Sequence, residues 1–115
     1  MDQELLDYNK ALHRIGGDAE FLIELLTDLV NQVDDSLDRL KQAVSSNDYE
    51  DLITLSHNLK GASANLNVTR LASHFLELED LGMEKKTDGA IDLLNLVSAD
   101  KDELHQFIQR SGLQS

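Results

Sequence analysis

Apolar residues recur at helical spacing along most of the chain and predict an all-helical fold. The clearest pattern lies between residues 18 and 45, opposite a side rich in acidic and amide side chains. Its seven aliphatic residues fall within an arc of about 80° at 100° per residue: Leu22, Leu26, Leu29, Val33, Leu37, Leu40 and Val44. This pattern predicts a long amphipathic helix with one buried stripe.

Shorter stripes of the same kind predict four more helices, at about residues 2–15, 48–66, 69–84 and 89–110. Short polar turns separate these segments, and helices joined by short turns pack antiparallel to one another. We therefore expect an all-α fold, an antiparallel up-down-up-down four-helix bundle with an additional short N-terminal helix. Residues 1–115 would form a single domain.

Composition narrows the classes of partner and location. The chain has no cysteine, which excludes disulfides and thiolate metal sites, and 22 acidic against 10 basic residues give a net charge of −12. This charge argues against nucleic acid as a partner, because binding to phosphates needs clustered Lys and Arg. No apolar run approaches the ~20 residues that span a bilayer. We therefore expect a cytoplasmic protein with no membrane insertion. We also expect a monomer, because one bundle uses all the apolar stripes.

One histidine, His57, is predicted to point away from the core. Helical spacing places it roughly 170° from the leucine stripe of residues 48–66. Its neighbours on the helix surface are Ile53, Lys60, Gly61 and Ala64. Three of these four are small or apolar, whereas an ordinary solvated surface is charged. The pattern predicts a surface that another protein covers.

The residue types around His57 suit a phosphoryl group. A neutral imidazole has a free ring nitrogen that can attack phosphorus. Lys60 could offset the added negative charge, and Gly61 would leave the approach open. The chain lacks a glycine-rich nucleotide loop, a Walker lysine motif and a receiver-type aspartate cluster. We therefore interpret His57 as a phosphoryl carrier, not as part of an enzyme, with catalysis supplied by a partner.

A lone exposed histidine is more often an ordinary surface residue, and the other three histidines fit that interpretation. His13, His74 and His105 have no Lys-Gly pair beside them, and we interpret them as structural or incidental. A metal site in the bundle core would require Glu-x-x-His pairs, which the sequence does not contain. No metal or other cofactor is therefore expected.

The residues around His57 resemble the signature of histidine-containing phosphotransfer (HPt) domains of bacterial multistep phosphorelays. Similarity extends to residues 11–18 and 77–82 and so covers nearly the whole chain. The family usually has glycine where this chain has Asn67; asparagine tolerates the same left-handed backbone, so we expect only a small stability cost. The matching positions are His57, Lys60, Gly61, Ser63, Leu66 and Leu71.

The resemblance implies that His57 takes a phosphoryl group from a receiver-domain aspartyl phosphate and passes it to another receiver domain. Lys60 would steady the group and Gly61 would give access. Glu79, on the next helix, would either orient the imidazole or be a plain surface carboxylate. Ile53 and Ala64 would form part of the docking surface. Mg²⁺ is expected on the partner receiver only, which could belong to a hybrid sensor histidine kinase.

Two alternatives stay open on the sequence. The chain could be the phosphoacceptor domain of a chemotaxis-type histidine kinase, which has a similar His-x-x-Lys-Gly helix but is phosphorylated by an ATP-binding domain. It could also be a helical adaptor that binds partners without a covalent step. Detection of a phosphohistidine separates the adaptor from the other two functions.

Overall fold

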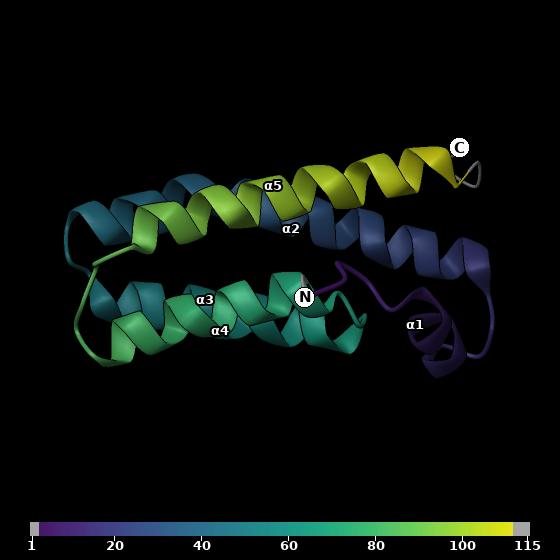
Figure 1. Cartoon of the computed structure of the whole chain (residues 1–115), viewed down its shortest axis with the longest axis horizontal. Coiled ribbons are helices and arrows are strands. Elements are labelled where there is room, and N and C mark those ends of the chain that lie inside the picture. The colour runs from purple at the N-terminus through teal and green to yellow at the C-terminus, as the bar shows by residue number, and fades with distance from the viewer. Residues whose placement is uncertain (1–2, 112–115) are drawn as a thin grey trace.

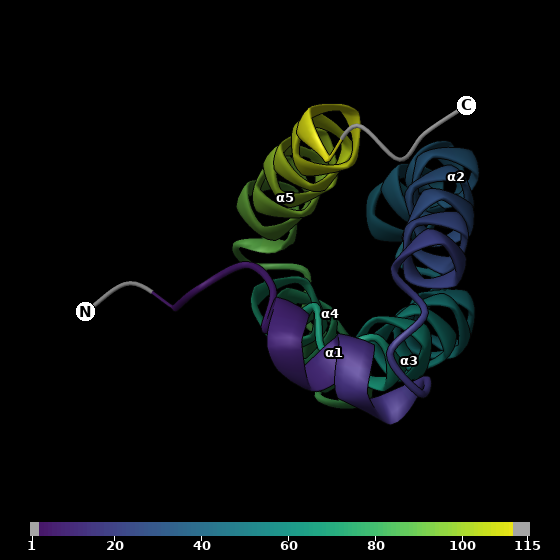
Figure 2. The same cartoon turned by 90° about the vertical axis from the view of Figure 1, so that its right-hand side faces the viewer.

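The computed structural model describes residues 3–111, which form five helices and no strand (Figure 1). The helices are α1 (Tyr8–Arg14), α2 (Ala19–Ser45), α3 (Tyr49–Asn65), α4 (Thr69–Met83) and α5 (Ala90–Arg110). Helices α2 to α5 stand in a ring in which each contacts the next and α5 contacts α2 (Figure 2). The predicted all-α bundle with a short N-terminal helix is confirmed.

The apolar stripes meet in the middle of this ring. All seven aliphatic residues of the α2 stripe are buried. The buried apolar stripes of α4 and α5 comprise Leu71, Phe75 and Leu78, and Ala90, Leu94, Val97, Leu104 and Ile108. Phe75 on α4 is wholly buried and is the largest of the fully enclosed side chains. Burying a side chain of this size contributes about 1.5–3 kcal/mol, so these stripes supply most of the stabilisation.

The N-terminal helix is shorter than the predicted range of 2–15, and this part of the prediction was wrong. Residue 2 lies outside the described residues, residues 3–7 are not helical, and α1 begins only at Tyr8. Asp7 caps the helix, since its side chain accepts a hydrogen bond of 3.1 Å from the backbone N–H of Lys10. Leu5 is nevertheless buried, although it lies before the helix begins. The apolar residues that suggested a longer helix therefore include one outside it.

Tertiary hydrogen bonds explain why the segment before α1 is not helical. The Asp7 N–H donates to the carbonyl of Asn67 at 2.9 Å, and the Arg70 N–H donates to the carbonyl of Leu5 at 3.3 Å. Asn67 has a φ of 57°, the left-handed conformation expected in place of glycine. Arg14 at the end of α1 donates to Asn67 Oδ1 at 3.2 Å. Helix α1 is thereby held beyond the ends of α3 and α4, beneath the N-terminal part of α2 (Figure 1).

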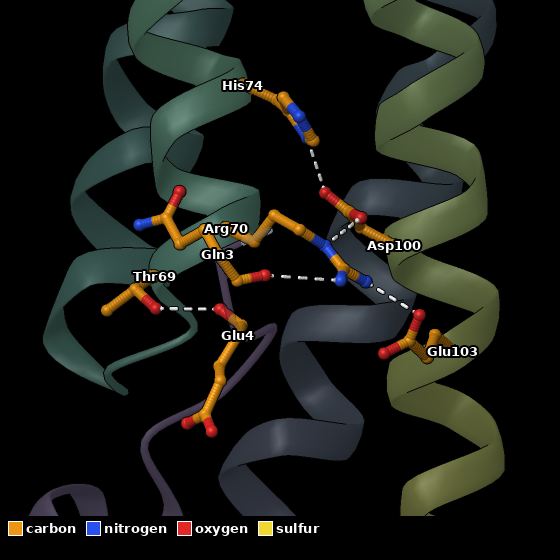
Figure 3. Close-up of polar contacts among 7 residues, drawn as sticks. All are labelled: Gln3, Glu4, Thr69, Arg70, His74, Asp100 and Glu103. Atoms are coloured by element: carbon orange, nitrogen blue, oxygen red, sulfur yellow. Dashed lines mark hydrogen bonds and ion pairs between the residues drawn. The ribbon is translucent and has the colours of Figure 1, made fainter. Parts of the chain in front are cut away.

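A buried carboxylate fastens α4 to α5 (Figure 3). The side chain of Asp100, only 4% exposed, accepts hydrogen bonds from Arg70 Nε at 2.8 Å and from His74 Nδ1 at 2.5 Å. Arg70 also pairs with Glu103 at 2.6 Å and donates to the carbonyl of Gln3 at 3.4 Å. The cluster therefore joins two bundle helices to the N-terminal segment.

We predict that Asp100→Ala lowers the free energy of unfolding by about 3 kcal/mol, because it leaves the partly buried charge of Arg70 without its enclosed partner. Urea denaturation at neutral pH measures this loss. Glu103→Ala is the matched control: Glu103 is half exposed, and its removal should cost less than about 1 kcal/mol. Equal losses in the two variants would contradict the importance of burial.

Candidate functional site

His57 lies in the middle of α3 with its side chain directed outward and 62% exposed. Asp48 caps this helix by accepting a hydrogen bond of 3.1 Å from the Asp51 N–H, which fixes where the helix begins. Leu52 and Leu59 are buried on the opposite side of α3. The helix therefore presents the ring to solvent while its other side packs into the core.

Glu79 on α4 contacts both polar side chains of the site. One carboxylate oxygen lies 2.8 Å from His57 Nδ1, and the other accepts a hydrogen bond of 2.6 Å from Lys60 Nζ. The Glu79 side chain is only 11% exposed, so it is not a plain surface carboxylate. The contact between Lys60 and Glu79 was not foreseen in the sequence, where the two residues are 19 positions apart.

The carboxylate of Glu79 determines which nitrogen of a neutral His57 ring is free. Hydrogen bonding from Lys60 lowers the pKa of Glu79, and the contact with His57 lowers it further, although burial acts in the opposite direction. Glu79 is therefore ionised near neutral pH and can only accept hydrogen bonds. The proton of the neutral ring is then held on Nδ1, and the lone pair is on Nε2.

The other predicted site residues surround this ring on α3. A Cβ built at Gly61 would have no atom within 4 Å, so the space beside it is open. Ala64 is exposed and Ile53 is half-buried. The structure thus places all three residues on the surface of α3 near His57.

Two exposed apolar residues on α4 were missed by the sequence analysis. Leu76 is 44% exposed and Met83 is 66% exposed. They lie three residues before and four residues after Glu79, which places them beside it on the helix surface. Their seven-residue spacing around a glutamate was the available signal, but it could not be connected with His57 before α4 was known to pack beside α3.

His74 forms an arrangement of the same kind but is poorly accessible. Its Nδ1 contacts a carboxylate that also binds a cation, as His57 Nδ1 does, yet the His74 side chain is only 15% exposed (Figure 3). The structure thus separates an exposed histidine from a structural one. Across residues 3–111, no group of three or more His, Asp or Glu is placed to hold a metal ion.

The family comparison gives one clear result. A sequence model described as "Hpt domain" matches residues 24–111, which include most of α2 and all of α3, α4 and α5. Searches of curated proteins and of solved structures gave no match. None of the helices in the described part of the chain is long and apolar enough to cross a membrane.

We predict that Glu79 contributes stability in a pH-dependent way. Because its pKa is lower in the folded than in the unfolded chain, its contribution is present above about pH 4.5 and is lost as the pH falls through the folded pKa. Glu79→Gln should therefore be less stable than the unaltered protein at neutral pH, and the difference should shrink in acid. Urea denaturation of both proteins at several pH values measures it. A difference that stays constant would contradict the lowered pKa.

Proposed function

Because the chain belongs to the Hpt domain family, we propose that it relays a phosphoryl group through His57 from one receiver domain to another. Hpt domains are histidine phosphotransfer modules of phosphorelays; they carry the group and are not catalysts. The observation that carries the assignment to His57 is the contact between its Nδ1 and Glu79, combined with an exposed ring. This combination leaves Nε2 both nucleophilic and reachable.

The chemical step follows from this arrangement. The lone pair of Nε2 attacks the phosphorus of an aspartyl phosphate, forming the N–P bond as the P–O bond to the aspartate breaks. The bonding electrons leave with the aspartate carboxylate. The ring keeps its proton on Nδ1 and becomes positively charged, and the anionic Glu79 stabilises that charge. Transfer to the second receiver reverses these steps.

Lys60 supplies a positive charge beside the acceptor nitrogen. Its ammonium group binds Glu79 in the unphosphorylated protein, and about a quarter of its side chain is exposed. A phosphoryl group adds a charge of about −2. We infer that Lys60 then shares its donors between Glu79 and the phosphoryl oxygens. Gly61, one turn from His57, leaves room for the incoming group.

The partner would dock on the apolar surface around His57. This surface combines residues of α3 and α4, and a receiver domain that reaches Nε2 has to cover both. The receiver would also bring the catalytic Mg²⁺, so the relay needs no cofactor of its own. We place this function in the cytoplasm, with the protein acting as a monomer. The proposed docking residues are Ile53, Ala64, Leu76 and Met83.

The test is phosphoryl transfer from a receiver domain phosphorylated on its aspartate. We expect label on the protein that is labile in acid and stable in alkali, and no label on His57→Gln. His105→Gln is the control, because His105 is exposed on α5 and outside the site. Label that persists in His57→Gln would overturn the assignment. Labelling only by a kinase domain and ATP would indicate the chemotaxis-type function, and no label from either source would indicate the adaptor.

We predict that Lys60→Ala slows transfer without unfolding the protein. A hydrogen bond to a charged group contributes about 1.5–3 kcal/mol, which corresponds to a rate reduced by roughly 10- to 100-fold. Alanine favours helix, so the far-ultraviolet circular dichroism should be unchanged. Single-turnover transfer measures the rate, and Lys60→Arg, which keeps the charge, should be slowed less. An unchanged rate in Lys60→Ala would contradict this role.

A further inference from the structure

We propose that Gly82 is a positioning residue: the absence of a side chain at Gly82 sets the distance between α3 and α4 at which Glu79 can hold the ring of His57. Only the predicted effect of Gly82 on phosphoryl transfer rests on the proposed function of His57. The effect of Gly82 on the ring itself can be measured in the absence of any partner.

Gly82 is buried inside α4, where that helix approaches the backbone of α3. A Cβ at this position would lie 2.7 Å from Ile53 Cγ1, 3.4 Å from the carbonyl oxygen of Tyr49 and 3.5 Å from the Ile53 nitrogen. The first distance is far below van der Waals contact. Glycine inside a helix is less favourable than alanine. The close approach of α3 explains why glycine occupies this position nevertheless.

The side chain of Ile53 cannot easily make room for a Cβ. Isoleucine is branched at Cβ and has one strongly preferred χ1 rotamer in a helix, so its Cγ1 is held in place. The other two atoms near a Cβ at Gly82 are backbone atoms of α3; they lie at ordinary contact distance, so the clash with Ile53 Cγ1 is the one that must be relieved. A side chain at Gly82 would therefore be accommodated mainly by moving α4 away from α3.

The contact between Gly82 and Ile53 lies next to the site along the same pair of helices. Gly82 follows Glu79 by three residues, and Ile53 precedes His57 by four, so each is about one helical turn from its partner in the site. The Glu79 oxygens lie 2.8 Å from His57 Nδ1 and 2.6 Å from Lys60 Nζ. A displacement of about 1 Å would take both distances beyond good hydrogen-bond geometry.

Loss of the contact with Glu79 would change the reactive nitrogen of His57. Without an acceptor at Nδ1, the proton of the neutral ring exchanges between the two nitrogens. The form with the proton on Nε2 has no lone pair there and cannot attack phosphorus. Gly82 would in this way influence the nucleophile through Glu79 without touching it.

The experiment measures the ring-nitrogen chemical shifts of His57 by NMR in alkaline solution. The unaltered protein should hold its proton on Nδ1, and Gly82→Ala should show a substantial population with the proton on Nε2. Combining Gly82→Ala with Ile53→Ala removes the Cγ1 that blocks the new Cβ, and the double variant should return to the Nδ1–H form. It also keeps the test valid if Gly82→Ala alone does not fold.

Gly61→Ala is the matched control, because it adds the same methyl group to α3 in open space. It should leave the proton on Nδ1. An Nδ1–H ring in Gly82→Ala, or failure of the double variant to restore it, would overturn the proposal. A shift of the same size in Gly61→Ala would also overturn it.

Transfer from a phosphorylated receiver domain supplies the second measurement. Gly82→Ala should transfer more slowly than the unaltered protein, and the double variant should match Ile53→Ala alone. If no protein is phosphorylated but the nitrogen shifts change as expected, the proposed function fails while the positioning role of Gly82 stands. If phosphorylation occurs and the rate of Gly82→Ala is unchanged, the positioning role fails while the proposed function stands.

Discussion

The site depends on the carboxylate of Glu79, which contacts both His57 and Lys60. A nearly buried carboxylate is costly unless donors surround it, and here both donors come from the neighbouring helix α3. The same two bonds that compensate its burial hold His57 and Lys60 in place. Glu79 therefore links the packing of α3 against α4 to the chemistry of the imidazole, and its two bonds require the helices to approach closely.

Helix α4 has a polar cluster on each side, and burial separates their roles. Toward α3, Glu79 holds an exposed histidine; toward α5, Asp100 holds a histidine that is largely enclosed (Figure 3). In both clusters a carboxylate binds Nδ1 together with a cation. Under the proposed function, exposure of the ring and not the His–carboxylate–cation arrangement itself distinguishes the carrier histidine from the structural one.

Four of the ten basic residues of this acidic chain form ion pairs between neighbouring helices of the bundle. Every adjacent pair in the ring of four is joined by at least one ion pair, although exposed pairs of this kind contribute little stability individually. Their positions favour one alignment of neighbouring helices over others. The pairs are Arg39–Asp51 between α2 and α3, Lys60–Glu79 between α3 and α4, Arg70–Asp100 between α4 and α5, and Lys101–Asp34 between α5 and α2.

Helical periodicity by itself determined the four bundle helices, the buried stripes and the outward direction of His57, because spacing along a helix dictates which residues share a side. Residue type, not periodicity, predicted the left-handed turn at Asn67, because asparagine tolerates that backbone conformation. Only the tertiary structure decided that residues 3–7 are not helical, that Glu79 reaches two residues of α3, and that Gly82 lies against Ile53. These features depend on distances between segments far apart in the chain, which are set by side-chain packing and not by local spacing.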